Sequence, residues 1–185
     1  MSRRGPGQLP VKLFGDLLNY STQHAPGRNF VCAGAKATHF LFDLAMAVYP
    51  EYMVAPIRQD LVEVGFEQLM SPQEVDAALA TTEGTVLVAV NSVCGCAASK
   101  ARPALKLALA SADKKPGKLV TVFAGMETDA VAKMREHLLP YPPSSPCIGL
   151  FKDGELVHMI ERYHIEGSDL MRIVNNLQGA FEEYC

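Results

Sequence analysis

The feature that most constrains the fold of this chain is a continuous apolar run, residues 85–90, followed four residues later by Cys94 and then Cys96. The run is mostly β-branched and lacks polar alternation, which is typical of a strand buried on both faces of a sheet covered by helices. Residues 97–110 have a helix-forming composition, with only Pro103 expected to kink the helix. The sequence therefore predicts a central strand, a short turn carrying two cysteines, and a helix.

Downstream segments repeat this alternation. Residues 118–123 form a second strand-like run after a charged loop, which completes a β-α-β unit. In residues 128–139 apolar side chains recur at helical spacing, and prolines at 140, 142 and 143 end the pattern. We expect a second strand and then a second helix.

A tight hairpin is expected near the C-terminus. Asp153 and Gly154 lie between two apolar runs, residues 147–151 and 155–160, and Asp-Gly in this setting favours a two-residue turn. Residues 168–169 can cap a last helix, in which apolar side chains recur at helical spacing. From residue 85 onward the expected order is β-α-β-α-β-β-α.

Two further helices are expected before this core. Residues 51–64 place apolar side chains on one helical face, with an interruption or a restart at Pro56 and an end at Gly65. Residues 71–74 form a capping box with proline at the first helical position, so residues 75–80 should form a short helix.

The element order, a parallel half followed by an antiparallel half, resembles the core of thioredoxin-like proteins. We therefore expect an α/β protein with a central mixed sheet flanked by helices, extra N-terminal helices, and a thioredoxin-like domain over residues 46–185. Residues 1–45 show no sustained period and contain only two acidic residues. They are expected to be a poorly ordered extension, or the product of a start upstream of the true one at Met46.

Composition and charge argue against several functional classes. A chain of 185 residues, 49% of them hydrophobic, suits one domain, and a net charge of −3 with scattered basic residues argues against nucleic-acid binding. The longest uncharged stretch, residues 84–99, is too short to span a membrane. The cysteines suit a reducing, cytoplasmic compartment; they are Cys32, Cys94, Cys96, Cys147 and Cys185.

Cys94 is the candidate catalytic nucleophile. It enters a helix, where backbone N–H groups and the helix dipole stabilise a thiolate, the reactive form in disulfide exchange. Gly95 would allow a partner chain to approach Cys94 and would permit a sharp backbone. A Cys94–Cys96 disulfide would close a very small, strained ring, which suggests an oxidising or isomerising couple. Because the same strain opposes closure, the resolving role of Cys96 stays open.

Other residues extend this hypothesis. Pro146 follows Ser145 directly before the third strand of the core, where a thioredoxin-like fold faces its active cysteine, and a cis bond there would leave backbone groups to pair with substrate. Cys185, at the chain end, is a candidate resolving thiol, whereas Cys147 is expected to be a packed thiol.

Several charged residues receive no catalytic role. Lys100 and Arg102 are expected to be exposed helix charges. His158 is expected in a strand and His164 in a polar loop.

Segments beyond the cysteines resemble the bacilliredoxin family. They are residues 91–98, 101–103, 120–125, 132–136, 143–146 and 164–167, together with the terminal cysteine. The resemblance runs from about Met46 to Cys185. It implies that Cys94 removes bacillithiol, or a related low-molecular-weight thiol, from mixed disulfides on S-thiolated client proteins, and that disulfide isomerase activity accompanies this. The small thiol would be a co-substrate, with no other cofactor. Ser99 occupies a place where the family is expected to have glycine.

Two rival interpretations stay open. Cys94 and Cys96 could join Cys147 or Cys185 and a histidine in a zinc or copper site, although the sequence lacks a second close Cys/His pair and we assign no metal ligand. Alternatively, the chain could be a scaffold that binds partners without turnover. The oligomeric state is left open.

Overall fold

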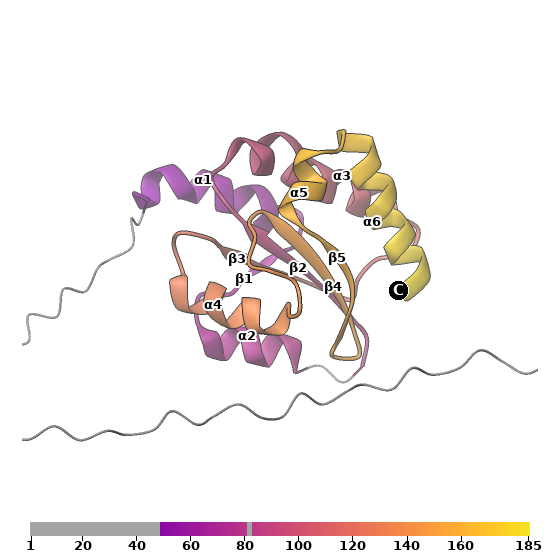
Figure 1. The fold of residues 1–185 in the computed structure, drawn as a ribbon, viewed down its shortest axis with the longest axis horizontal. Coiled ribbons are helices and arrows are strands. Elements are labelled where there is room, and N and C mark those ends of the chain that lie inside the picture. Colours follow the sequence, from indigo (N-terminus) through magenta and orange to yellow (C-terminus); the bar gives the residue numbers. More distant parts are fainter. Residues whose placement is uncertain (1–48, 81–82) are drawn as a thin grey trace, which may run out of the picture. The chain divides into compact units, whose positions relative to one another are not determined.

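The computed structural model describes residues 49–80 and 83–185 (Figure 1). The expectations for residues 1–45, including Cys32, and the boundary at Met46 lie outside these residues. No helix in the described segments is long and apolar enough to cross a membrane.

A five-stranded mixed sheet forms the centre of the described part, in the order β1-β3-β2-β4-β5. Its strands are β1 (Glu67–Gln68), β2 (Thr85–Asn91), β3 (Lys118–Phe123), β4 (Cys147–Lys152) and β5 (Glu155–Ile160). The middle strand, β2, is parallel to β3 and antiparallel to β4, and all seven of its residues are buried. The expected central strand is thus confirmed. A parallel half joined to an antiparallel hairpin in this order is the thioredoxin-like fold.

Helices cover both faces of the sheet (Figure 1). On one face lie α1 (Glu51–Val62), the π-helical turn η1 (Ala97–Ala101), α3 (Arg102–Ser111), α5 (Arg162–Glu166) and α6 (Leu170–Tyr184). On the other face lie α2 (Pro72–Leu79) and α4 (Thr128–His137). Side chains of β2 alternate between the two cores: Leu87 and Ala89 face α3 and α6, whereas Val88 and Val90 face α2 and α4.

Local signals in the sequence explain several element boundaries. Ser71 and Glu74 form the expected capping box at the start of α2. Asp153 and Gly154 both have positive φ, 52° and 86°, as the two-residue turn between β4 and β5 requires. The first helix, α1, continues through Pro56 to Val62, so Pro56 neither interrupts nor restarts it.

The helix after the cysteines differs from the single helix expected. It begins with η1, in which Arg102 N donates to Ala97 O, and continues as α3. Pro103 has no N–H for the carbonyl four residues earlier, so the backbone widens into a π-turn ahead of it. This turn is the form that the expected kink takes.

Candidate active site

Cys94 lies between the end of β2 and the first turn of the helix that contains η1. Its Sγ accepts a hydrogen bond from Ser92 Oγ at 3.2 Å and another from Ala97 N at 3.3 Å. The thiol is reduced and half-buried. Cys94 thus presents a partly exposed sulfur that is held by two donors at a helix start, as its place in the sequence predicts.

The two neighbouring thiols are driven apart in acidity. Burial alone would raise the pKa of Cys94, but hydrogen bonds from Cys96 and Ser92 oppose it. The Ala97 N–H and the positive charge of Arg162 act in the same direction, and the net pKa of Cys94 is lowered. Burial raises the pKa of Cys96, and its hydrogen bond to Cys94 and the charge of Cys94 raise it further. Cys94 therefore ionises first, while Cys96 stays protonated and donates to it.

Arg162, on α5, links the cysteine pair to the loop before β4. Its Nε donates to Glu166 Oε1 at 2.8 Å, and its Nη1 donates to Ser145 O at 3.2 Å. Lys100 Nζ ties the same helix to η1 through Glu166 O at 2.7 Å. We did not anticipate Arg162 from the sequence, where residues 162–166 gave no helix signal.

The Ser145–Pro146 peptide bond is cis, as the sequence analysis raised. β4 starts at Cys147, which pairs with Val90 near the end of β2, so this loop and Cys94 lie at the same edge of the sheet. Pro146 is buried. The Ser145 carbonyl already accepts from Arg162, so a bound segment that pairs there uses its second lone pair or displaces the guanidinium.

Arg102 is buried, which contradicts the expectation of an exposed helix charge. Its Nη1 donates to Asn91 Oδ1 at 3.3 Å and to Ser92 O at 3.2 Å, and its Nε donates to Asp60 Oδ2 at 3.0 Å. A hydrogen bond from Lys106 is the main cause that lowers the pKa of Asp60, against burial and with help from Arg102. The π-turn of η1 leads directly into Arg102, whose guanidinium fixes the backbone that carries Ser92.

The remaining described cysteines lie away from the pair. Cys147 is only 2% exposed, and burial raises the pKa of its thiol to about 11, which confirms a packed thiol. Cys185 follows the last residue of α6. Its helix runs alongside α3, with Gln178 Nε2 donating to Ser111 Oγ near their common end, so Cys185 lies at the far end of both helices from Cys94 (Figure 1). A resolving role for Cys185 stays a prediction, one that requires rearrangement or a second copy.

Metal ligands do not gather in the described segments. Among residues 49–80 and 83–185 no group of three or more His, Cys, Asp or Glu side chains could hold a metal ion. The rival metal site needed Cys147 or Cys185 beside the pair, and the structure does not bring either one there.

Comparisons with known proteins place the chain in a family. Residues 49–185 match the family model described as disulphide isomerase. A bacilliredoxin of Halalkalibacterium halodurans is 52% identical over 140 residues, which cover 74% of this chain and 96% of that protein. A bacilliredoxin of Bacillus cereus is 51% identical, covering 74% and 97%, and one of Cytophaga hutchinsonii is 48% identical over 136 residues, covering 74% and 99%. The chain belongs to the bacilliredoxin family.

Solved structures similar to this bacilliredoxin-family chain are thioredoxins. One is a mutant thioredoxin from Halobacterium salinarum, with TM-score 0.44 and 18% identity over 63% of this chain and 88% of that one. Another is oxidised thioredoxin O2 from Arabidopsis thaliana, with TM-score 0.43 and 18% identity over 63% and 94%. The fold assignment rests on the strand order given above. Family and fold together give the chain a role in thiol–disulfide oxidoreduction.

Gly95 differs from its expected role in this bacilliredoxin fold. Its φ is not positive, it is exposed, and a Cβ built there meets nothing within 4 Å, so the backbone does not need glycine. The expectation of a sharp backbone at Gly95 is therefore wrong. Access for a partner chain is the remaining reason for glycine beside Cys94.

Gly95→Ala is expected to leave the fold intact and to raise the free energy of unfolding by up to about 1 kcal/mol, because glycine weakens a helix. Exchange with a peptide disulfide should slow several-fold, since the methyl group stands in the path of the peptide, while exchange with hydroxyethyl disulfide stays unchanged. Stopped-flow rates for both substrates and urea unfolding test this. Equal slowing toward both substrates would show that the methyl group disturbs Cys94 itself.

Ser92→Ala is expected to raise the pKa of Cys94, because the thiolate loses the O–H donor at 3.2 Å. A net hydrogen bond of about 0.5–1.5 kcal/mol corresponds to alkylation at pH 7 that is roughly two- to tenfold slower. The rate of iodoacetamide alkylation against pH measures it. Ser99→Ala is the matched control, since Ser99 Oγ donates to Gly95 O and not to sulfur; a similar slowing there would contradict the assignment.

Proposed function

We propose that this chain reduces mixed disulfides between proteins and a low-molecular-weight thiol such as bacillithiol, with Cys94 as the attacking thiol, and that it also isomerises disulfides. The observation that carries the proposal is the reduced, half-exposed Cys94 sulfur, which accepts two hydrogen bonds at a helix start beside a protonated Cys96. The name bacilliredoxin, given to relatives about 50% identical, supports the choice of small thiol.

The first step is a thiol–disulfide exchange. The Cys94 thiolate attacks the small-thiol sulfur of the mixed disulfide, the existing S–S bond breaks, and a new one joins Cys94 to the small thiol. The client leaves as a thiolate and takes a proton from solvent. Two electrons pass from Cys94 to the client sulfur, so the client is fully reduced.

Cys96 becomes more reactive after this step. Its hydrogen bond to Cys94 and the negative charge of Cys94 both raise its pKa in the resting protein. Once Cys94 carries the small thiol that charge is gone, so the pKa of Cys96 falls toward the range in which thiolates form. Cys96 can then attack Cys94 Sγ, which expels the small thiol and leaves a Cys94–Cys96 disulfide for an external dithiol to reduce.

A second route uses the small thiol as co-substrate. Its thiolate attacks the mixed disulfide on Cys94 and yields the symmetric small-molecule disulfide and free Cys94. This route needs no resolving cysteine and no other cofactor. Cys185 could enter only from a second copy or after rearrangement, because it lies at the far end of α6.

Client proteins would bind where the cysteine pair meets the loop of Ser145 and Pro146. Gly95 leaves the approach to Cys94 open, and Arg162 places a positive charge where a carboxylate of a small thiol could pair with it. S-thiolated proteins in a reducing, cytoplasmic compartment are the proposed partners.

The test uses a peptide that carries bacillithiol as a mixed disulfide. Reduced wild-type protein should release the peptide thiol, and Cys96→Ser should accumulate one bacillithiol on Cys94, located by peptide mass spectrometry. The same peptide carrying glutathione measures the choice of small thiol, and recovery of a scrambled-disulfide protein measures isomerisation. Client binding without release in wild-type protein would favour the scaffold interpretation, and an adduct found only on another cysteine would overturn the role of Cys94.

A further inference from the structure

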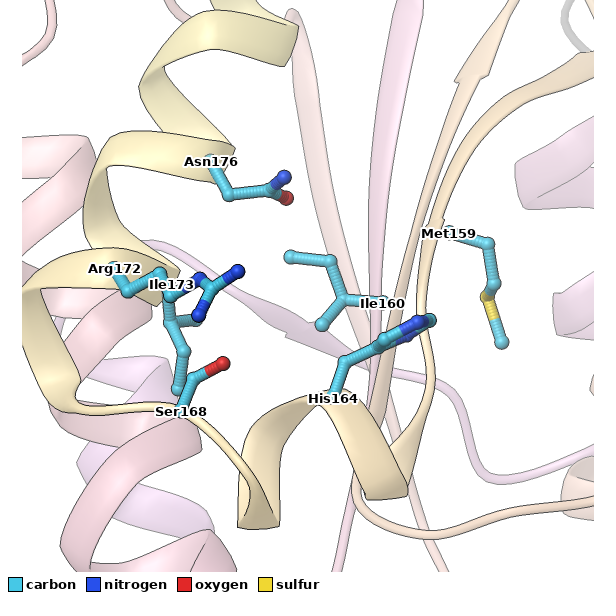
Figure 2. Close-up of a pocket in the computed structure, with 7 residues that line it drawn as sticks. All are labelled: Met159, Ile160, His164, Ser168, Arg172, Ile173 and Asn176. Carbon is cyan, nitrogen blue, oxygen red and sulfur yellow. The ribbon is translucent and has the colours of Figure 1, made fainter.

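A second polar cavity lies between β5, α5 and α6, apart from the cysteine pair. Its volume is about 270 Å³, and its lining combines His164, Ser168, Arg172 and Asn176 with an apolar side (Figure 2). Small-molecule sites in proteins begin at about 300 Å³, so this cavity suits a ligand of a few heavy atoms.

The polar side chains present donors to the cavity. Asn176 Oδ1 accepts from His158 Nε2 at 2.8 Å, which leaves the Asn176 amide N–H groups as donors. His164 Nδ1 accepts from Glu161 N at 3.2 Å, so the proton of the neutral ring is on Nε2. Two neighbouring side chains thus each commit an acceptor elsewhere and keep a donor.

The charge in the cavity comes from Arg172. Its guanidinium has no ion-pair or hydrogen-bond partner within residues 49–80 and 83–185, and it points into the cavity together with the Ser168 hydroxyl (Figure 2). No carboxylate lines the cavity; the nearby Asp169 carboxylate accepts from Arg172 N at 2.9 Å as the cap of α6. An unpaired guanidinium with three donors and no acid around it fits an oxyanion.

The remaining wall is apolar. Ile160 and Ile173 are 5% and 3% exposed, and Met159 completes this side of the cavity. A bare inorganic ion would leave that surface uncovered, whereas a short carbon skeleton would cover it.

We propose that this cavity binds a small organic anion, whose carboxylate or phosphate group pairs with Arg172 and whose carbon skeleton packs on Ile160 and Ile173. The site is distinct from the redox centre. Arg162 and Glu166 face η1 and the cysteines, whereas His164, two residues after Arg162, faces the cavity on the other side of α5.

The test is an NMR titration of the full-length protein with succinate, inorganic phosphate and uncharged succinamide at constant ionic strength. Amide shifts at Ser168, Arg172 and Asn176 should move and saturate with succinate, with phosphate, or with both, and should not respond to succinamide. The anion that saturates at the lower concentration identifies the preferred group as carboxylate or phosphate. Shifts that stay linear for both anions would overturn the site.

Arg172→Gln should weaken anion binding at least tenfold and leave the rest of the spectrum in place, because the side chain is at the surface. Lys115→Gln is the matched control, since it removes one exposed positive charge in the loop between α3 and β3 and should leave binding unchanged. Equal binding by Arg172→Gln and wild type, or equal weakening in both variants, would overturn the proposal.

Discussion

Replacing Cys94 with serine is expected to slow the release of a small thiol from a mixed-disulfide client by about 10³-fold or more. Removal of a covalent nucleophile has effects of this scale, and a serine hydroxyl neither ionises near neutral pH nor forms an S–S bond. The wild-type rate should rise with pH through the lowered pKa of Cys94 and level off above it. Release measured from pH 5 to 9, with alkylation of Cys94 alongside, tests both statements.

Cys147→Ala is the matched control for this experiment. Cys147 is buried and its thiol has a pKa of about 11, so it contributes neither thiolate nor an accessible sulfur near neutral pH. The variant should keep the wild-type pH profile and release rate as long as it is folded. Loss of release in folded Cys147→Ala, with Cys94→Ser still active, would assign the reaction to the wrong cysteine.

Much of the fold could be predicted because its signals are local. β2 is recognisable as a run of seven buried residues, α2 by its capping box, and the hairpin by Asp153 and Gly154. β1 could not be found in this way, since it has two residues, Glu67 and Gln68, and exists only through its pairing with β3. Strands this short depend on tertiary contacts and not on their own composition.

The same division holds at the site. Cys94 could be predicted because a strand, a turn and a helix start are all readable around it. Arg102 and Arg162 could not, since their roles depend on distant partners, Asp60 for the first and the Ser145 carbonyl for the second. A charged residue in an amphipathic segment reads as solvent-exposed until its partner is placed beside it.

A second large effect is expected at a buried ion pair away from the cysteines. Arg58 pairs with Glu127, and only 9% and 8% of the two side chains are exposed. Arg58 also lies 5.2 Å from the centre of the Phe123 ring and donates to Gln68 Oε1 at 3.3 Å. Glu127→Ala should lower the free energy of unfolding by about 3–5 kcal/mol, because it leaves a buried guanidinium without its counter-charge.

Urea unfolding of three variants separates the cost of a broken pair from the worth of the pair. Arg58→Met combined with Glu127→Leu should recover most of the loss, because Glu127 Oε2 has no hydrogen-bond partner within the described residues and apolar side chains remove that penalty. Glu136→Ala breaks the solvent-facing pair with Lys133 and should change stability by less than about 0.5 kcal/mol. If Glu127→Ala and Glu136→Ala were equally mild, the buried guanidinium would have to be hydrated after the substitution, and the pair would not stabilise this side of the sheet.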